Sequence, residues 1–307
     1  MIQFGTNPIA WANDDDQSLG ADIPTARILH EAGRLIGFDG IENGHRWPQD
    51  DPQALKQLLG DHGLAFISGW HSLNVLTNSI ADEQAAIQPH LDKLKHNGCT
   101  VCIACETSNT IQGDQKPLSA RPVLDAAGMK EFAIRVEAIA QYCADQGIDL
   151  VYHHHMGTVV QSPADIDAFM AETLAAGGAT KLLFDAGHCY FGGGDPAVVL
   201  AKHATRVRHF HAKNVRPKVR AQVEAEGWSF MDGVRGSVFT VPGDQEGAVE
   251  FEPLLQILKD TGYEGWIVIE AEQDPDLRNP LLYQTLGLHT LKRIARDVGL
   301  IPARGAM

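Results

Sequence analysis

Residues 146–154 read QGIDLVYHH, a glycine followed by a short apolar run that ends in histidines. The segment before it, MKEFAIRVEAIAQYCADQ, has the apolar spacing of an amphipathic helix. Glycine is favoured directly after a helix because it enters the left-handed backbone region at little steric cost. This stretch therefore predicts a helix followed at once by a β-strand, with polar side chains where the strand ends.

The same unit of helix, glycine and apolar run recurs along the chain. It gives six candidate strands, at residues 36–43, 62–70, 97–105, 146–154, 177–185 and 261–270. Two further apolar runs, at residues 2–7 and 207–215, complete a set of eight. Eight strand–helix repeats over this length predict a (β/α)₈ TIM barrel, with residues 1–307 forming one domain. A doubly wound open sheet is the alternative. It is disfavoured because no glycine-rich dinucleotide fingerprint follows the first strand.

The connection after the seventh strand is unusually long, from Val215 to about Glu250. Connections of this length in compact domains usually cover a functional site or are disordered. This one contains aromatic and basic residues, among them Trp228 and Arg235, which makes a disordered linker a poor fit. We expect a lid or substrate loop with one short helix inside it.

Composition narrows the class of protein and its partners. The formal net charge of −14 repels phosphate backbones and disfavours nucleic acid as a partner. No stretch reaches the roughly 18 apolar residues of a membrane helix, and the first residues lack the pattern of a signal peptide. Five cysteines fit buried, reduced thiols better than disulfides. We therefore expect a cytoplasmic protein that binds neither nucleic acid nor membranes.

Ionisable residues follow four consecutive candidate strands, at the end of the barrel where active sites form. Because side chains alternate along a strand, one residue from each strand can face the barrel axis. Two imidazoles and two carboxylates suit Mn²⁺, Co²⁺, Fe²⁺ or Zn²⁺ better than Mg²⁺. The predicted metal ligands are His153, Asp185, His211 and Glu270.

Other polar and aromatic residues near the strand ends complete the predicted site. The candidate catalytic residues are His155, His188, Lys213 and Glu272. The candidate substrate-binding residues are Trp11, Glu42, Trp70, Trp228 and Arg235. Trp11 and Trp70 would form an apolar wall for a sugar ring, although core packing explains them equally well. We expect His154 to be structural or exposed, and His209 to be a core histidine.

Six segments carry a resemblance to a known family. The sequence resembles the xylose-isomerase-like barrel superfamily and, within it, more closely the inosose dehydratases of inositol catabolism. The resembling segments are GTNPIAWANDD (5–15), YHHHMGTVVQ (152–161), LLFDAGHCYFGGGDP (182–196), HFHAKNVR (209–216), SFMDGVRGSVFTVPGD (229–244) and IVIEAEQDP (267–275).

The resemblance implies a ligand set and cofactors. The superfamily usually places a glutamate at the end of strand five, followed by Asp, His and Glu on the next strands. By position these correspond to His153, Asp185, His211 and Glu270. His153 departs from the pattern, which leaves open whether His153, His155 or a water is the ligand. The resemblance further implies Mn²⁺ or Co²⁺, and it associates glutathione with the activity.

The activity that the resemblance implies is the elimination of water from scyllo-inosose to give a trihydroxycyclohexane-1,2-dione. Such a reaction requires removal of the proton next to the ketone, stabilisation of the enolate, and protonation of the departing hydroxide. His155 or Glu272 would act as the base, and His188 or Lys213 as the acid or substrate anchor. The partner would be a small cyclitol or sugar, with a homo-oligomer expected by analogy.

Three rival functions remain open at this point. A ketose or inosose isomerase or epimerase of the same fold would share the metal and the enolate. A phosphodiesterase resembling endonuclease IV is disfavoured by the net charge and by too few additional ligands. A sugar-binding barrel without catalysis would bind its ligand and not convert it.

Overall fold

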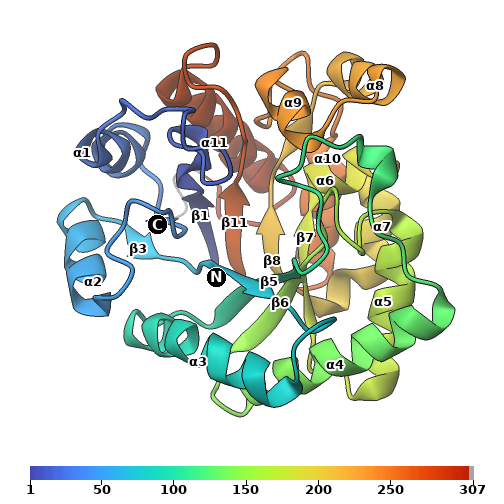
Figure 1. Ribbon diagram of the computed structural model, residues 1–307. Helices are drawn as coiled ribbons and strands as arrows, with labels where there is room; N and C mark the ends of the chain where they lie inside the picture. Colours follow the sequence, from blue (N-terminus) through green and yellow to red (C-terminus); the bar gives the residue numbers. More distant parts are fainter. Residues whose placement is uncertain (304–307) are drawn as a thin grey trace.

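Parallel strands form the centre of the computed structural model, which describes residues 1–303 (Figure 1). The hydrogen-bonded order is β3-β2-β1-β11-β8-β7-β6-β5-β4. Their bounds are β1 (Ile2–Thr6), β2 (Gly40–Ile41), β3 (Ala65–Phe66), β4 (Trp70–Leu73), β5 (Val101–Glu106), β6 (Asp149–His153), β7 (Lys181–Asp185), β8 (Val207–His211) and β11 (Gly265–Ile269). The two end members, β3 and β4, belong to one stretch of chain interrupted at residues 67–69. The eight predicted strand regions therefore form a closed barrel.

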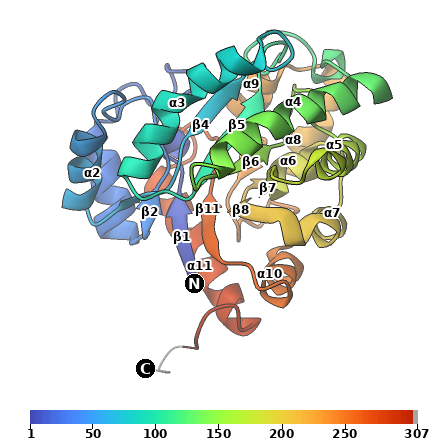
Figure 2. The ribbon, with the colours of Figure 1, turned by 90° about the horizontal axis from the view of Figure 1, so that it is seen from below.

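Helices surround the strands, with α3 and α4 on the opposite side of the barrel from α10 and α11 (Figure 2). The larger ones are α2 (Pro52–Asp61), α3 (Ile80–His96), α4 (Ala126–Ala144), α5 (Pro163–Ala176), α7 (Pro196–His203), α10 (Phe251–Asp260) and α11 (Pro280–Asp297). The short α1 (Thr25–Leu29) continues into η2 (His30–Ile36). Gly98 and Gly147, which lie three and two residues before the first residues of β5 and β6, have φ values of 77° and 79°. These positive angles confirm that glycine permits the turn from helix to strand.

Side-chain alternation along the strands separates the core from the site. On β6, Leu150 and Tyr152 pack outward into the main core between sheet and helices. Val151 instead belongs to a small interior cluster with Leu183 of β7. Because the side-chain period of a strand is two residues, the next inward position on β6 is His153. The alternation thus turns a buried apolar interior into a polar one at the carboxyl ends of the strands.

The long connection (residues 215–250) forms a small layered unit above the carboxyl end of β8 (Figure 1). It contains α8 (Pro217–Glu226) and α9 (Phe230–Arg235), where one helix was expected. An antiparallel pair joins β9 (Asn214–Val215) to β10 (Phe239–Thr240). Phe230 and Phe239 pack with Met156 and Phe191 in a separate apolar cluster. The role of this unit as a lid stays a prediction.

Two expectations from composition can be compared with the structure. All five cysteines are buried and free, as predicted. Within residues 1–303, none of the helices combines the length and hydrophobicity that a membrane crossing requires.

Candidate metal centre and cavity

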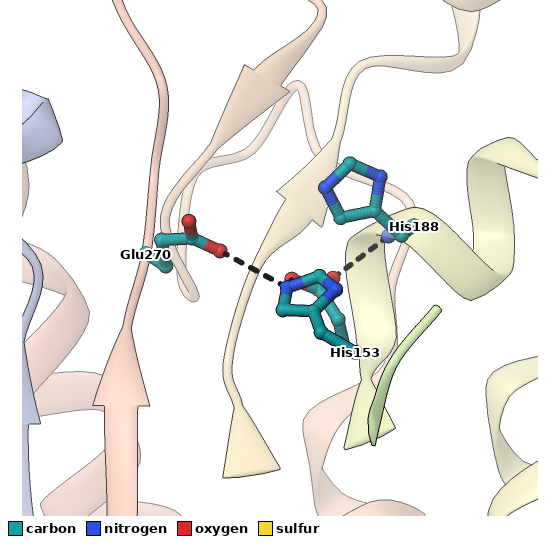
Figure 3. A group of neighbouring side chains, drawn as sticks. His153, His188 and Glu270 are labelled. Atoms are coloured by element: carbon teal, nitrogen blue, oxygen red, sulfur yellow. Dashed lines mark hydrogen bonds and ion pairs between the residues drawn. The ribbon is translucent and has the colours of Figure 1, made fainter. Parts of the chain in front are cut away.

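The four predicted metal ligands meet at the carboxyl ends of β6, β7, β8 and β11. His211 Nδ1 lies 2.8 Å from Glu270 Oε2 and 3.4 Å from Asp185 Oδ2. His153 Nε2 lies 3.7 Å from Asp185 Oδ2 and 3.9 Å from Glu270 Oε2. Figure 3 shows His153 and Glu270 pointing toward one another from their separate strands. The strands therefore gather two imidazoles around the two carboxylates. A ring nitrogen of His188 also lies within 4.8 Å of ligand atoms of His153, Asp185 and Glu270.

Three of the converging atoms are buried without a hydrogen-bond partner: Asp185 Oδ2, His211 Nδ1 and Glu270 Oε2. The second polar atom of two of the ligands is occupied, because His153 Nδ1 donates to the His154 carbonyl and Asp185 Oδ1 accepts the His188 N–H. Burying polar atoms without partners costs free energy. A divalent cation with mixed nitrogen and oxygen ligands satisfies all of them, so the residues fit a metal.

Glu42 binds the Nε2 side of the His211 ring, opposite the Nδ1 atom that faces the candidate metal centre. Glu42 Oε1 accepts hydrogen bonds from His211 Nε2 at 3.1 Å and His209 Nε2 at 2.7 Å, and Oε2 accepts from Asn7 at 2.8 Å. Burial raises the pKa of Glu42, but the two imidazoles outweigh it and lower the pKa to about 2. With Nε2 held by Glu42, His211 directs Nδ1 toward Glu270 and Asp185 at the candidate metal centre.

The four candidate catalytic residues lie together beside the metal centre. Lys213 Nζ lies 2.9 Å from His188 Nε2 and 3.2 Å from Glu272 Oε2. His155 Nδ1 donates to the carbonyl of Met156 at 2.8 Å, and its ring centroid lies 3.9 Å from that of His188. Lys213 and His188 are completely buried, whereas His155 and Glu272 line the adjacent cavity. Only the latter two can reach a substrate in this arrangement.

Neighbouring charges set the protonation of this cluster. Burial lowers the pKa of Lys213, but Glu270, Asp185 and Glu272 outweigh it and raise the pKa above its usual value. Burial raises the pKa of Glu272, and Lys213 opposes this only in part. Burial also lowers the pKa of His155, to about 3, so its imidazole is neutral at pH 7. A neutral imidazole with Nδ1–H bound to a carbonyl offers Nε2 as a proton acceptor.

A cavity of about 360 Å³ opens directly above the candidate metal centre. Its apolar wall includes Trp70, Ile9 and Ile103. The Trp70 indole is 36% exposed, lies 5.6 Å from the His153 ring between centroids, and donates to Ser72 Oγ. The volume and the mixed apolar and polar lining fit a small-molecule ligand such as a six-membered polyhydroxylated ring.

Three predicted substrate-binding residues lie away from this cavity. Trp11 is fully buried and its indole donates to Glu31 at 2.7 Å, so it belongs to the core. The Trp228 indole donates a hydrogen bond to Glu226, within the long connection. Arg235 binds the carboxylate of Asp16. Trp70 and Glu42 do line the cavity, as expected.

Several cavity residues were missed by the sequence analysis. Six of them lie in loops that follow the strands, and these are Asn7, Asp14, Asp15, Asn43, His45 and Gln112. The seventh, Ser72, lies within β4. The rule that polar residues gather after barrel strands applies to Asn7 and Asn43, and could have identified them. Asp15 lies at the mouth. Desolvation by the surrounding walls, with Asp14 and Glu270 nearby, raises the pKa of Asp15 to about 6.

Sequence comparison relates the chain to known proteins. The family described as "Xylose isomerase-like TIM barrel" matches residues 31–293. "Rhizopine catabolism protein MocC" of Rhizobium meliloti is 39% identical over 299 residues, covering 97% of this chain and 90% of that protein. "Inosose dehydratase" of Geobacillus thermodenitrificans is 38% identical over 284 residues, covering 92% of this chain and 93% of that protein.

Solved structures share the fold at much lower identity. The probable 3-DHS dehydratase AsbF from Bacillus anthracis superimposes with a TM-score of 0.65 at 16% identity, covering 94% of this chain and 98% of that one. The D-allulose 3-epimerase from Methylomonas sp., in complex with D-allulose, gives 0.64 at 17% identity, covering 95% and 96%. At these identities the likeness establishes the architecture alone.

Proposed function

The chain belongs to the xylose isomerase-like TIM barrel family, and we propose that it is a metal-dependent dehydratase that converts scyllo-inosose into a trihydroxycyclohexane-1,2-dione. One observation carries the proposal: buried, unpartnered ligand atoms converge beneath a cavity sized for a six-membered ring. The inosose dehydratases that share 38% identity or slightly less with the chain support the choice of reaction.

The residues that would hold the cation are His153 through Nε2, Asp185 through Oδ2, His211 through Nδ1 and Glu270 through Oε2. This donor set favours Mn²⁺ or Co²⁺, with Zn²⁺ or Fe²⁺ as alternatives. Lewis-acid stabilisation of the enolate oxygen is the chemistry that a bound divalent cation supplies here.

His155 and Glu272 divide the proton transfers in this proposal. His155 Nε2 removes the proton from the carbon next to the ketone, and the enolate forms. Glu272, in its protonated form, gives a proton through Oε1 to the hydroxyl on the following carbon, which leaves as water. The resulting enol takes up a proton on carbon, loses its O–H proton and becomes the dione. Oε1 of Glu272 is buried without a partner beside the cavity, which supports this role.

Lys213 and His188 support the reaction from behind the cavity wall. Lys213 Nζ donates a hydrogen bond to Oε2 of Glu272, the proposed proton donor. The same Nζ lies 3.1 Å from Oε2 of Glu270, a proposed metal ligand, so Lys213 contacts both parts of the site. His188 packs against His155 and orients its ring. In this proposal Lys213 and His188 take these supporting roles, and the direct acid or anchor roles expected from the sequence stay the alternative. Trp70 offers its ring face to the C–H groups of the substrate.

Incubation of the purified protein with scyllo-inosose tests the function. The protein is first stripped with chelator and then reloaded with Mn²⁺ or Co²⁺. A dehydratase releases a product lighter by one water, which mass spectrometry detects directly. A product of unchanged mass would instead identify the isomerase or epimerase alternative, and no product would leave a binding protein. The matched control is D185N, loaded in the same way.

Three further expectations belong with this proposal. Stimulation by glutathione and a homo-oligomeric state rest on the family resemblance, and a cytoplasmic location rests on the composition of the sequence. Assays with and without glutathione, and light scattering on the purified chain, test the first two.

A further inference from the structure

The turn that follows β1 and η1 (Pro8–Ala10) is fixed by one buried side chain. Asn13 is fully buried, and its Oδ1 accepts the backbone N–H groups of Asp15 at 2.7 Å and Asp16 at 2.8 Å. The backbone N–H of Asn13 also donates to the carbonyl of Leu19. Such an Asx turn holds its backbone in one conformation. The direction in which Asp15 projects is therefore set by the fold.

Asp15 is exposed and lines the cavity, and Gln112 and the buried Glu272 belong to the same lining. Its neighbour Asp14 lines the same cavity but is engaged by His45, whose Nδ1 lies 2.5 Å from Asp14 Oδ1. Asp15 comes from a different loop than any of the four candidate metal ligands. It therefore reaches a part of a bound ligand that the metal centre does not serve.

Arg235, in α9 of the long connection, binds a residue of this turn. Its Nη2 and Nε lie 2.6 Å and 3.1 Å from Asp16 Oδ2, although the two residues are 219 positions apart in the sequence. Leu19, at the end of the turn, packs against the apolar cluster of the long connection. Since Asp16 directly follows Asp15, a shift of α9 would be transmitted to the Asp15 carboxylate.

The charges around the cavity indicate what Asp15 binds. Within residues 1–303, no lysine or arginine belongs to the lining, whereas five carboxylates do: Asp14, Asp15, Glu42, Glu270 and Glu272. Carboxylates accept hydrogen bonds and repel anions. The chemistry at the mouth thus favours a ligand that presents hydroxyl donors and carries no phosphate or carboxylate.

We propose that Asp15 is a specificity-determining residue whose carboxylate accepts hydrogen bonds from substrate hydroxyl groups, and that Arg235 is a positioning residue that acts on Asp15 through Asp16. The identity of the substrate rests on the proposed function. The contact between Asp15 and a hydroxyl-rich ligand does not depend on whether water is eliminated.

The first test compares D15A and D15N with the unchanged protein in steady-state assays on scyllo-inosose. A lost hydrogen bond to a charged group corresponds to a KM increase of about 10-fold or more for D15A. The kcat should change by less than about 3-fold, because uniform binding is lost and the proton transfers are intact. D15N keeps the shape of the side chain and one acceptor oxygen, so its KM should lie between that of the unchanged protein and that of D15A.

The second test is a double-mutant cycle. R235A should raise KM in the natural background and leave it unchanged in the D15A background, because its effect passes through Asp15. R235K should restore part of the affinity. The matched control is R220A on α8, which removes an exposed pair with Glu224 in the same long connection and should leave KM unchanged. A merely structural role of Arg235 would give equal effects in both backgrounds.

Calorimetry can measure the binding of myo-inositol to the Mn²⁺-loaded protein. Because this measurement does not depend on turnover, it tests the inference separately from the proposed function. Weaker binding by D15A supports the inference even if scyllo-inosose is not converted. Lack of conversion by the unchanged protein overturns the proposed function alone. Unchanged KM and unchanged myo-inositol affinity in a folded D15A variant would overturn the inference.

Discussion

His211 Nδ1 and Glu270 Oε2 lie 2.8 Å apart, yet neither atom has a hydrogen-bond partner. Asp185 Oδ2 lies 3.4 Å from the same nitrogen, so an imidazole and two carboxylates from three strands gather in a small buried space. A divalent cation held among them would satisfy all three atoms at once, and the following predictions depend on it.

Metal binding should stabilise the fold. At a free Mn²⁺ or Co²⁺ concentration 100 times Kd, binding to the native state adds about 2.7 kcal/mol to the free energy of unfolding. Thermal denaturation with chelator and with added metal measures the shift in Tm. D185N is the control, because its remaining oxygen can still cap α6 (Ala186–Phe191) while the ligand oxygen is lost. A metal-induced shift of equal size in D185N would argue against the assigned ligands.

Replacing Glu42 by glutamine should weaken metal binding without removing a ligand. The carboxylate holds Nε2–H of His211 and raises the basicity of Nδ1, and loss of such a partner costs about 10- to 100-fold in metal affinity. Competition with a fluorescent chelator measures the affinity. E83Q alters another buried carboxylate, which binds Asn74 and Asn78 away from the site, and should leave the metal affinity unchanged.

Exchange of the substrate's α-proton with D₂O separates the two proton-transfer residues. H155N should lose both exchange and dehydration, each by at least about 100-fold, because the base is gone. E272Q should lose dehydration to a similar extent and still catalyse exchange, since the enolate forms and returns. Nuclear magnetic resonance follows both reactions in one sample. Exchange retained by H155N and lost in E272Q would mean that the roles are reversed.

Trp11 should affect stability and not catalysis. W11F removes the hydrogen bond to buried Glu31 and leaves that carboxylate with Arg27 alone, at a cost of about 1–3 kcal/mol in unfolding free energy. Urea denaturation measures the loss, and KM for scyllo-inosose should stay the same. A raised KM with unchanged stability would restore Trp11 to the substrate-binding residues.

The barrel could be predicted from the sequence because its signals are local. Most strands follow a helix that ends in glycine, as at Gly98 and Gly147, and this pattern requires no knowledge of distant contacts. The positions of the candidate metal ligands followed from the same local rule, because alternation along β6 and the polar strand ends fix which residues face inward. His153 lies 3.7 Å from Asp185 and 3.9 Å from Glu270, and its place among the ligands stays a prediction.

The positions of other site residues depend on contacts that the sequence does not reveal. Helix α6 begins directly after Asp185, which places His188 behind the wall against Lys213 and not in the cavity. The Trp11 indole donates a hydrogen bond to Glu31 in the core, and Arg235 binds Asp16 in the loop after β1. Asp15 stands in an acidic run that is typical of a solvent-exposed turn, so its role in the cavity was not apparent.

Anomalous diffraction from crystals loaded with Mn²⁺ tests the central claim most directly. We predict one strong peak within about 2.0–2.3 Å of His153 Nε2, Asp185 Oδ2, His211 Nδ1 and Glu270 Oε2, since ordinary bond lengths to nitrogen and oxygen ligands lie near this range. A peak elsewhere, or these four side chains paired with one another and with water at saturating metal, would contradict it.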